Sequence, residues 1–126
     1  MEIRPATMDD AQRLFDWRND PLTRAMSKTT DPVEWAGHVG WLERRLSRTA
    51  PMLFIAEIDG EPVGTFRVDA DEISYTVAPE HRGKGVAKAM LQVAFARFGK
   101  LRAEIKPENV ASIKAALAAG HQVALL

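Results

Sequence analysis

The sequence of 126 residues contains no cysteine, which excludes a disulfide framework, a thiolate nucleophile and a cysteine-based zinc site. It also lacks a net charge, because 17 Lys and Arg balance 17 Asp and Glu, so no long-range field draws the chain to nucleic acid or to an anionic membrane. No apolar run is long enough to span a bilayer, and the N-terminus has no apolar signal-peptide core. We expect a cytoplasmic protein with no nucleic-acid partner, no membrane partner and no metal.

Hydrophobic periodicity predicts a mixed α/β chain. Its length fits one domain, residues 1–126, and no linker, repeat or low-complexity tract divides it. Apolar alternation and helical stripes, bounded by turn residues, predict the element order βααβββαβαβ. The predicted strands cover residues 2–4, 52–58, 61–69, 72–77, 101–106 and 121–126, and the predicted helices cover 7–17, 31–48, 86–98 and 107–120.

Three local signals set boundaries for these elements. Residues 7–10 have the spacing of a capping box, in which two side chains satisfy the first N–H groups of a helix. Residues 31–34 combine an Asp N-cap, a Pro at the first helical position and an acid three residues after the cap. Asp59-Gly60, between two apolar-rich segments, predicts a two-residue hairpin turn.

A basic, glycine-rich turn, HRGKGVA, joins a predicted strand to a predicted helix. Gly83 and Gly85 let backbone N–H groups converge, and the helix N-terminus adds its own unpaired donors, so the turn suits an anion. Cations in and beside the first helical turn oppose the helix dipole, a placement that is unfavourable unless an anionic ligand binds there. These cations are Arg82, Lys84 and Lys88.

Two other glycine-rich frameworks fit the turn poorly. A P-loop needs four residues between its glycines and a Lys followed by Ser or Thr, and this turn has neither. A dinucleotide-binding fingerprint would begin at Gly83, with Glu104 near the place of its ribose-binding acid, but Lys88 stands where a third small residue belongs. The turn also follows three strands of a meander, which is not the setting of that fingerprint.

The turn and its flanks resemble the GNAT superfamily of acetyl-CoA-dependent N-acetyltransferases. Arg82 to Ala87 matches the R-x-x-G-x-G/A pyrophosphate loop of that family, EISYTVAPEHRGKGVA resembles its strand-turn-helix unit, and PENVASIKAALAAGH resembles its later helix. The resemblance implies a mixed central sheet of about six strands with helices on both faces and a short or missing seventh strand. It also implies transfer of acetyl from acetyl-CoA, as co-substrate, to a primary amine by direct attack in a ternary complex.

Two segments in the first half, DWRNDP and HVGW, resemble a branch that includes ribosomal-protein N-terminal acetyltransferases and pseudaminic-acid-type amino-sugar acetyltransferases. This resemblance implies an acceptor that is an amino sugar or the N-terminus of a peptide or protein. It leaves one alternative open, a homologue that binds acetyl-CoA or CoA without catalysis. Because the last segment, HQVALL, is an apolar strand with an unprotected edge, we also expect a homodimer.

The resemblance implies a cofactor site along the strand end, the turn and the start of the later helix. A splayed pair of strands would admit the pantetheine arm, and the N–H of Val77 or of Ala78 would polarise the thioester carbonyl. Asn109 and Ser112 match the cofactor-side Asn and Ser of the family, although Asn109 is also a good N-cap. The implied cofactor contacts are Thr76, Val77, Ala78, Arg82, Gly83, Lys84, Gly85, Val86, Ala87, Lys88, Asn109 and Ser112.

Direct attack needs a base, because a free alkylamine is mostly ammonium at neutral pH. Glu72 is the predicted base, with a solvated strand-end carboxylate as the alternative interpretation, and Glu104 is assigned to a surface charge ladder. Many relatives carry a Tyr that protonates the leaving thiolate where this sequence has Ala116. We predict that Ser112, Tyr75 or water takes that role, unless positioning alone suffices.

The predicted acceptor contacts come from the first two helices and are Arg18, Asn19, His38 and Trp41. Arg18 falls on an apolar stripe, so we expect it to be partly buried, with an anionic partner from the protein or the substrate. A packed or surface role for His38 is the alternative. On the second helix, His38 and Trp41 lie beside a predicted core stripe of Trp35, Val39, Leu42 and Leu46.

Overall fold

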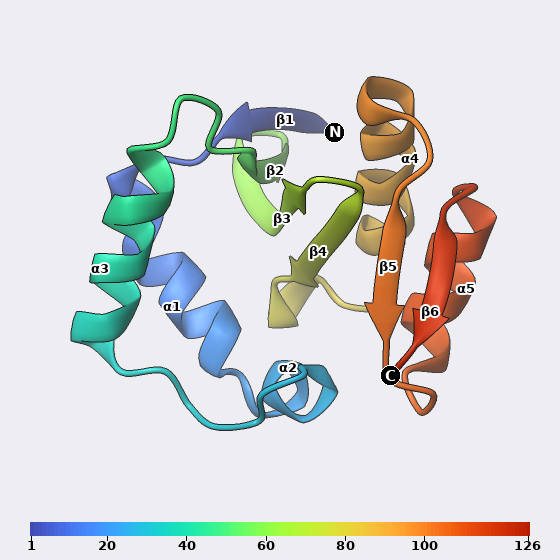
Figure 1. The fold of residues 1–126 in the computed structure, drawn as a ribbon, viewed down its shortest axis with the longest axis horizontal. Coiled ribbons are helices and arrows are strands. Elements are labelled where there is room, and N and C mark those ends of the chain that lie inside the picture. The colour runs from blue at the N-terminus through green and yellow to red at the C-terminus, as the bar shows by residue number, and fades with distance from the viewer.

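The computed structural model describes residues 1–126 and places six strands in one sheet (Figure 1). The strands are β1 (Glu2–Pro5), β2 (Leu53–Ile58), β3 (Glu61–Asp69), β4 (Glu72–Val77), β5 (Arg102–Ile105) and β6 (Gln122–Leu125). They lie in sequence order across the sheet, with β1 to β4 antiparallel and with β5 and β6 parallel to β4. The mixed sheet confirms the predicted fold class.

Helices cover both faces of this sheet (Figure 1). They are α1 (Ala11–Asn19), α2 (Pro21–Met26), α3 (Trp35–Leu46), α4 (Val86–Phe98) and α5 (Val110–Ala118), with short 3-10 turns at Met8–Asp10 and Pro79–His81. The element order therefore contains one helix, α2, that the sequence pattern does not predict. None of the helices combines the length and the apolar character that crossing a membrane requires.

Two apolar cores hold the layers together, because alternate strand residues point to opposite faces of the sheet. On one face, α1 and α3 bury a cluster that includes Trp17 and Leu42 against Ile55 of β2. On the other face, α4 and α5 bury a larger cluster that includes Met90 of α4 and Phe66 of β3. The cluster under α1 and α3 is therefore centred on β2, whereas the cluster under α4 and α5 is centred on β3.

The capping box predicted at residues 7–10 is present and anchors the start of α1. The Thr7 hydroxyl accepts a hydrogen bond from the Asp9 N–H, and the Asp10 carboxylate accepts one from the Thr7 N–H at 2.9 Å. Asp10 is fully buried and also accepts hydrogen bonds from Arg4, at 2.8 Å to each carboxylate oxygen, and from Arg13. Burial raises the pKa of Asp10, but the hydrogen bonds from Arg4, Thr7 and Arg13 outweigh it and leave the pKa lowered.

The start of α3 differs from the prediction. The helix begins at Trp35, after Glu34, and the Asp31-Pro32 signal lies outside it. The Asn19 side chain explains the shift, because its amide accepts a hydrogen bond from the Val33 N–H at 2.8 Å and donates one to the Val33 carbonyl at 2.9 Å. The Val33 carbonyl thus accepts from Asn19 and not from a helical N–H, and the first helical hydrogen bond runs from the His38 N–H to the Glu34 carbonyl.

The buried stripe of α3 also differs from the prediction, since its buried residues are His38, Leu42 and Arg45 while Trp35 is 45% exposed. The two polar residues are buried because their hydrogen bonds are satisfied. The His38 Nε2 donates to the Ala11 carbonyl at 2.8 Å, and Arg45 donates to the Val68 carbonyl at 3.2 Å.

Candidate functional site

The turn before α4 presents a row of unused backbone donors. Gly83 and Gly85 have φ angles of 75° and 76°, which only glycine adopts readily, and an added Cβ at either would meet no protein atom within 4 Å. No backbone N–H from Gly83 to Lys88 donates a hydrogen bond within the protein; the first to do so is that of Ala89, to Gly85. The turn is therefore an open concave nest at a helix N-terminus, which favours an anion.

The three cations of the turn differ in whether they form an ion pair within the protein. Lys84 and Lys88 are exposed and form no ion pair. Arg82 instead pairs with Asp20, the N-cap of α2, and donates to the Thr23 hydroxyl at 3.0 Å. Burial raises the pKa of Asp20, but hydrogen bonds from Arg82 and from the Thr23 backbone outweigh it and leave the pKa lowered. Asp20 is thus a carboxylate that competes with any anion for Arg82.

Strands β4 and β5 separate beside this turn. They pair only at Glu72 and Arg102, whereas β3 and β4 stay in register along the whole of β4. The two parallel strands therefore diverge toward their C-terminal ends. This splay was implied by the family resemblance, and it leaves the outer side of β4 without a strand partner.

The ladder with β3 decides which β4 donors face the gap. The Ala78 N–H donates to the Val63 carbonyl at 2.9 Å, and Ala78 itself is fully buried. Because successive residues in an antiparallel pair alternate in the direction of their N–H groups, those of Tyr75 and Val77 point away from β3, toward the splay. Ala78 is thereby excluded as the oxyanion donor. Of the two N–H groups predicted as oxyanion donors, that of Val77 remains a candidate. The Tyr75 N–H is a second candidate, which the sequence prediction did not include.

Two predicted catalytic side chains meet across this region. The Tyr75 hydroxyl forms a hydrogen bond with the hydroxyl of Ser112, which lies on α5. Burial raises the pKa of Tyr75, which keeps the phenol protonated at neutral pH. Asn109 is the N-cap of α5 and accepts a hydrogen bond from the Ser112 N–H. Ala116, at the position of the usual family Tyr, is fully buried.

The two acidic side chains near the start of the splay share one lysine. Lys28 lies 3.3 Å from the Glu72 carboxylate and 2.8 Å from that of Glu104. Hydrogen bonds from Lys28 and from Arg102 lower the pKa of Glu104. Glu104 thus belongs to the predicted charge ladder, and Glu72 faces the α1 side of the sheet with its carboxylate partly solvated and paired.

The four predicted acceptor contacts have different surroundings. Asn19 is committed to the Val33 backbone, and His38 is 7% exposed and bonded within the α1–α3 contact, so neither side chain is free to bind a substrate. Arg18 is half-buried as predicted, but its partners are the Ser27 hydroxyl and a backbone carbonyl, not an anion.

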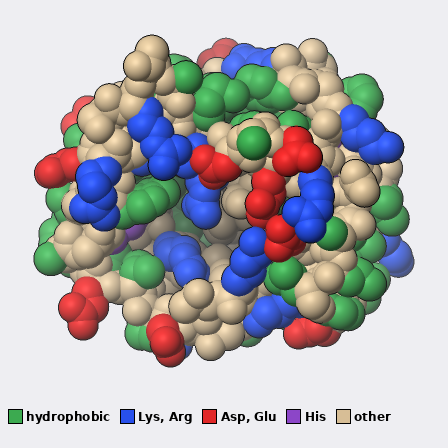
Figure 2. Space-filling view, viewed as in Figure 1, with side chains coloured by type: hydrophobic (Ala, Val, Ile, Leu, Met, Phe, Trp, Pro, Cys, Tyr) green, Lys and Arg blue, Asp and Glu red, His purple; other side chains and the backbone are tan.

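Trp41 is the fourth predicted acceptor contact. Its ring lies against Arg67, a residue that the sequence prediction missed. One neighbour of its ring is His38, stacked at 6.0 Å, and another is the guanidinium of Arg67, 5.7 Å from the ring centroid. Burial lowers the pKa of Arg67; Asp69 and Glu72 oppose the shift, while Arg45 and Arg18 add to it. Figure 2 shows the molecule hollowed near the centre of this view, with Lys and Arg side chains around the hollow and Asp and Glu side chains along its right side.

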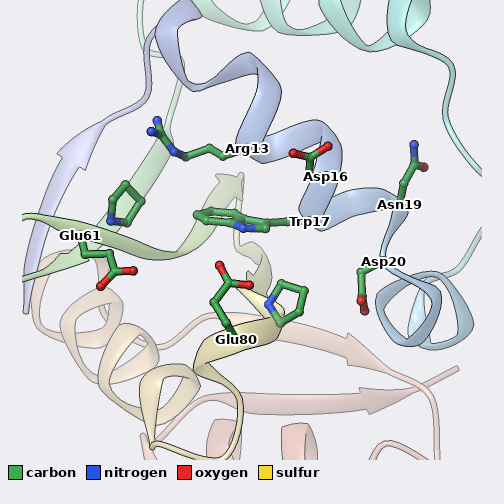
Figure 3. A pocket seen from close by; sticks show the side chains of 9 residues that line it. Arg13, Asp16, Trp17, Asn19, Asp20, Glu61 and Glu80 are labelled. Carbon is green, nitrogen blue, oxygen red and sulfur yellow. The ribbon is translucent and has the colours of Figure 1, made fainter.

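A separate cleft of about 490 Å³ lies between α1 on one side and the start of β3 and the turn after β4 on the other (Figure 3). Its walls carry Arg13, Asp16, Trp17 and Asp20 from the α1 region, and Glu61 and Glu80 from the opposite side. Four carboxylates against one guanidinium would repel a phosphate, so this cleft is not suited to a pyrophosphate. No group of three or more His, Asp or Glu side chains in the molecule is arranged to hold a metal ion.

Solved structures share this fold. The structure of yncA from Salmonella typhimurium, with its cofactor acetyl-CoA, is 24% identical and has a TM-score of 0.73, covering 95% of this chain and 78% of its own. A ribosomal-protein-alanine N-acetyltransferase from Brucella melitensis is 27% identical, with a TM-score of 0.72, covering 95% of this chain and 83% of its own. An aminoglycoside acetyltransferase in complex with coenzyme A and kanamycin is 19% identical, with a TM-score of 0.70, covering 94% of this chain and 81% of its own.

The family itself follows from the sequence match. No curated protein matches the chain at a significant level. The acetyltransferase (GNAT) domain family matches residues 1–122, which include every strand from β1 to β5, the glycine turn and α5. The chain therefore belongs to the GNAT acetyltransferase family.

Proposed function

We propose that this chain is an N-acetyltransferase that moves acetyl from acetyl-CoA to a primary amine by direct attack in a ternary complex. The observation that carries the proposal is the pairing of an open donor nest, Gly83 to Lys88, with a splay in which two β4 backbone groups lack partners. Family membership and the acetyl-CoA and CoA complexes of similar folds support the donor.

Each part of the donor has a matching surface. The pyrophosphate rests on the N–H groups of the nest, with Lys84 and Lys88 as free cations. The pantetheine arm lies between β4 and β5, where its amides take the place of the absent strand pairs. The N–H groups of Tyr75 and Val77 bind the pantetheine and the thioester carbonyl, and the donor on that carbonyl stabilises the developing oxyanion.

The chemistry needs two proton transfers and no enzyme nucleophile. The amine nitrogen attacks the thioester carbon, and its proton passes to Glu72, directly or through water. The carbon–sulfur bond then breaks, and the leaving thiolate receives a proton from the Tyr75 hydroxyl, which Ser112 orients. Glu72 releases its proton to water and Tyr75 regains one from water, which restores both groups. The products are the N-acetylated amine and CoA.

The acceptor proposed for the site is an amino sugar or the N-terminus of a peptide or protein. The segments DWRNDP and HVGW support this branch of the family. The structure of a ribosomal-protein-alanine N-acetyltransferase at 27% identity supports it as well.

Replacing Tyr75 by Phe tests the proposed acid. We expect Tyr75→Phe to lower kcat about 100-fold, because general acid catalysis contributes on the order of 10²–10⁴. The KM for acetyl-CoA should change little, since the backbone donors stay in place. Steady-state thiol release measures both values. An unchanged kcat would mean that the thiolate leaves without help from Tyr75.

Replacing Asp20 by Asn tests the competition for Arg82. Asn is as good an N-cap as Asp, so α2 keeps its first turn while the carboxylate charge is removed. We expect CoA to bind about 3- to 10-fold more tightly, because Arg82 is released toward the pyrophosphate. Calorimetric titration with CoA measures the change. Weaker binding would show instead that Asp20 positions Arg82 for the cofactor.

Thermal-shift measurements with acetyl-CoA, CoA and NADH test the donor assignment. A ligand that binds only the folded state raises the melting temperature. We expect stabilisation by acetyl-CoA and CoA, and a shift with NADH alone would contradict the assignment. Thiol release with amino sugars, peptides and simple amines then separates the enzyme from its alternative, a GNAT homologue that binds acetyl-CoA without catalysis.

A further inference from the structure

We propose that the hollow between α1, α3 and the polar face of β3 and β4 binds an oxyanion of the acceptor, a carboxylate or a phosphate, through Arg67 and Arg18. The inference rests on the proposed function, since it describes which amines the site would accept.

The sheet face beneath α1 and α3 changes from apolar to polar between neighbouring strands. Leu53 and Ile55 of β2 are buried, yet their direct neighbours on β3 are Arg67 and Thr65. Cross-strand neighbours point to the same side of a sheet. The polar surface continues on β4, where Ser74 lies opposite Arg67. The helices therefore bury the β2 part of this face, whereas β3 and β4 carry polar groups on it, where Figure 2 shows a hollow beside α1.

Positive charge exceeds negative charge on this face, although the Glu72 carboxylate also lies there and acts on Arg67, because Lys28 already pairs with Glu72. The Asp69 carboxylate forms ion pairs with three guanidiniums, those of Arg45 at 2.6 Å, Arg48 at 3.3 Å and Arg67 at 3.5 Å. Arg45 holds the shortest of these contacts, so Arg67 has only a weak share of the carboxylate. Arg18 forms no ion pair at all, and donates only to neutral oxygens of Ser27 and Thr29. An added anion would complete the charge balance.

Both guanidiniums are held in place before any ligand binds. Arg67 lies over the Trp41 ring, and the Arg18 guanidinium is fixed at 3.1 Å from the Ser27 hydroxyl. Each keeps N–H groups without a protein partner, because a guanidinium has five. Arg67 neighbours Ser74, the residue before Tyr75, so an anion on Arg67 would bring an attached amine close to the reacting strand.

Matched pairs of amines test the proposal without turnover. Alanine and alaninamide differ by a carboxylate, and glucosamine 1-phosphate and glucosamine differ by a phosphate. Each is titrated calorimetrically into the chain, both free and saturated with CoA. We expect the anionic member of one pair to bind at least about 10-fold more tightly, the range of a charge-assisted hydrogen bond. The pair that shows the preference identifies the oxyanion as carboxylate or phosphate.

Variants then assign the preference to the two residues. Arg67→Met should reduce the affinity ratio to about one, Arg18→Met should reduce it in part, and Arg67→Lys should restore some of it. Arg48→Met is the matched control, because Arg48 shares Asp69 but is 56% exposed; its ratio should stay at the wild-type value. A wild-type ratio near one for both pairs, or a ratio that survives both Arg67→Met and Arg18→Met, would overturn the proposal. Absence of thiol release would contradict the proposed function alone, since these ratios need no catalysis.

Discussion

Replacing Gly85 by Val is expected to weaken CoA binding about 100-fold or more while the chain still folds. Gly85 caps α4 with a φ of 76°, and the space where its Cβ would point is empty of protein atoms. A branched side chain there would stand in the path of the pyrophosphate and disturb the nest. Losing two charge-assisted hydrogen bonds accounts for a change of this size. Calorimetric titration with CoA measures it.

Gly99→Val is the matched control for backbone strain. Gly99 ends the same helix, has the same φ of 76° and also has no protein atom within 4 Å of an added Cβ. Gly85 lies in the left-handed region, with a ψ of 14°, and Gly99 lies in a region that is almost exclusive to glycine, with a ψ of −162°. A branched residue is disfavoured at both, so each variant should lose about 1–3 kcal/mol of stability, and Gly99→Val should lose at least as much as Gly85→Val. Only Gly85→Val should lose affinity for CoA. Equal CoA affinity in the two variants would mean that the turn binds something else.

Replacing Asp10 by Asn is expected to lower the free energy of unfolding by about 3 kcal/mol. The buried carboxylate joins Arg4 of β1 to Arg13 of α1 and also caps the first turn. The loss stays at the low end of the range for broken buried pairs, because both guanidiniums are about one-third exposed and regain water. Denaturant unfolding measures the change, with exposed Asp9→Asn as the control expected near zero.

The same variant should change how stability depends on pH. The pKa of Asp10 is lowered in the folded state, so its contribution is fully present above the unfolded pKa of about 3.9 and is lost as the pH falls through the folded value. The stability difference between wild type and Asp10→Asn should therefore be constant at neutral pH and shrink in acid. A difference that grows in acid would contradict the assigned direction.

The strands and the hairpin could be predicted because their signals are local. All six strands lie within one residue of the predicted bounds, and the Asp59-Gly60 turn is present. The missed helix, α2, has no buried residue, so it leaves no apolar stripe in the sequence. The false start of α3 arises from Asn19, whose contact with Val33 spans fourteen positions and has no local signature.

The glycine turn was predictable residue by residue, since its conformation depends on Gly83 and Gly85 themselves. The surroundings of the site were less predictable from the sequence. Alternation of side chains did not reveal that the Ala78 N–H is used by β3, because that requires the register of the ladder. Arg67 was missed because a single Arg on a predicted strand is usually interpreted as a side chain that faces solvent. The polar run on the same face, opposite buried Ile55 and Leu53, was the signal that could have found it.

Mass spectrometry of the reaction with isotopically labelled acetyl-CoA tests the central claim most directly. The chain is incubated with labelled donor and with the panel of amino sugars, peptides and simple amines, and the products are followed over time. We predict that labelled N-acetyl amine and free CoA form in equal amounts, with no acetylated enzyme preceding them, and that Gly85→Val forms neither. Binding of acetyl-CoA with every amine left unmodified, or an acetyl-enzyme that forms before product, would contradict transfer by direct attack.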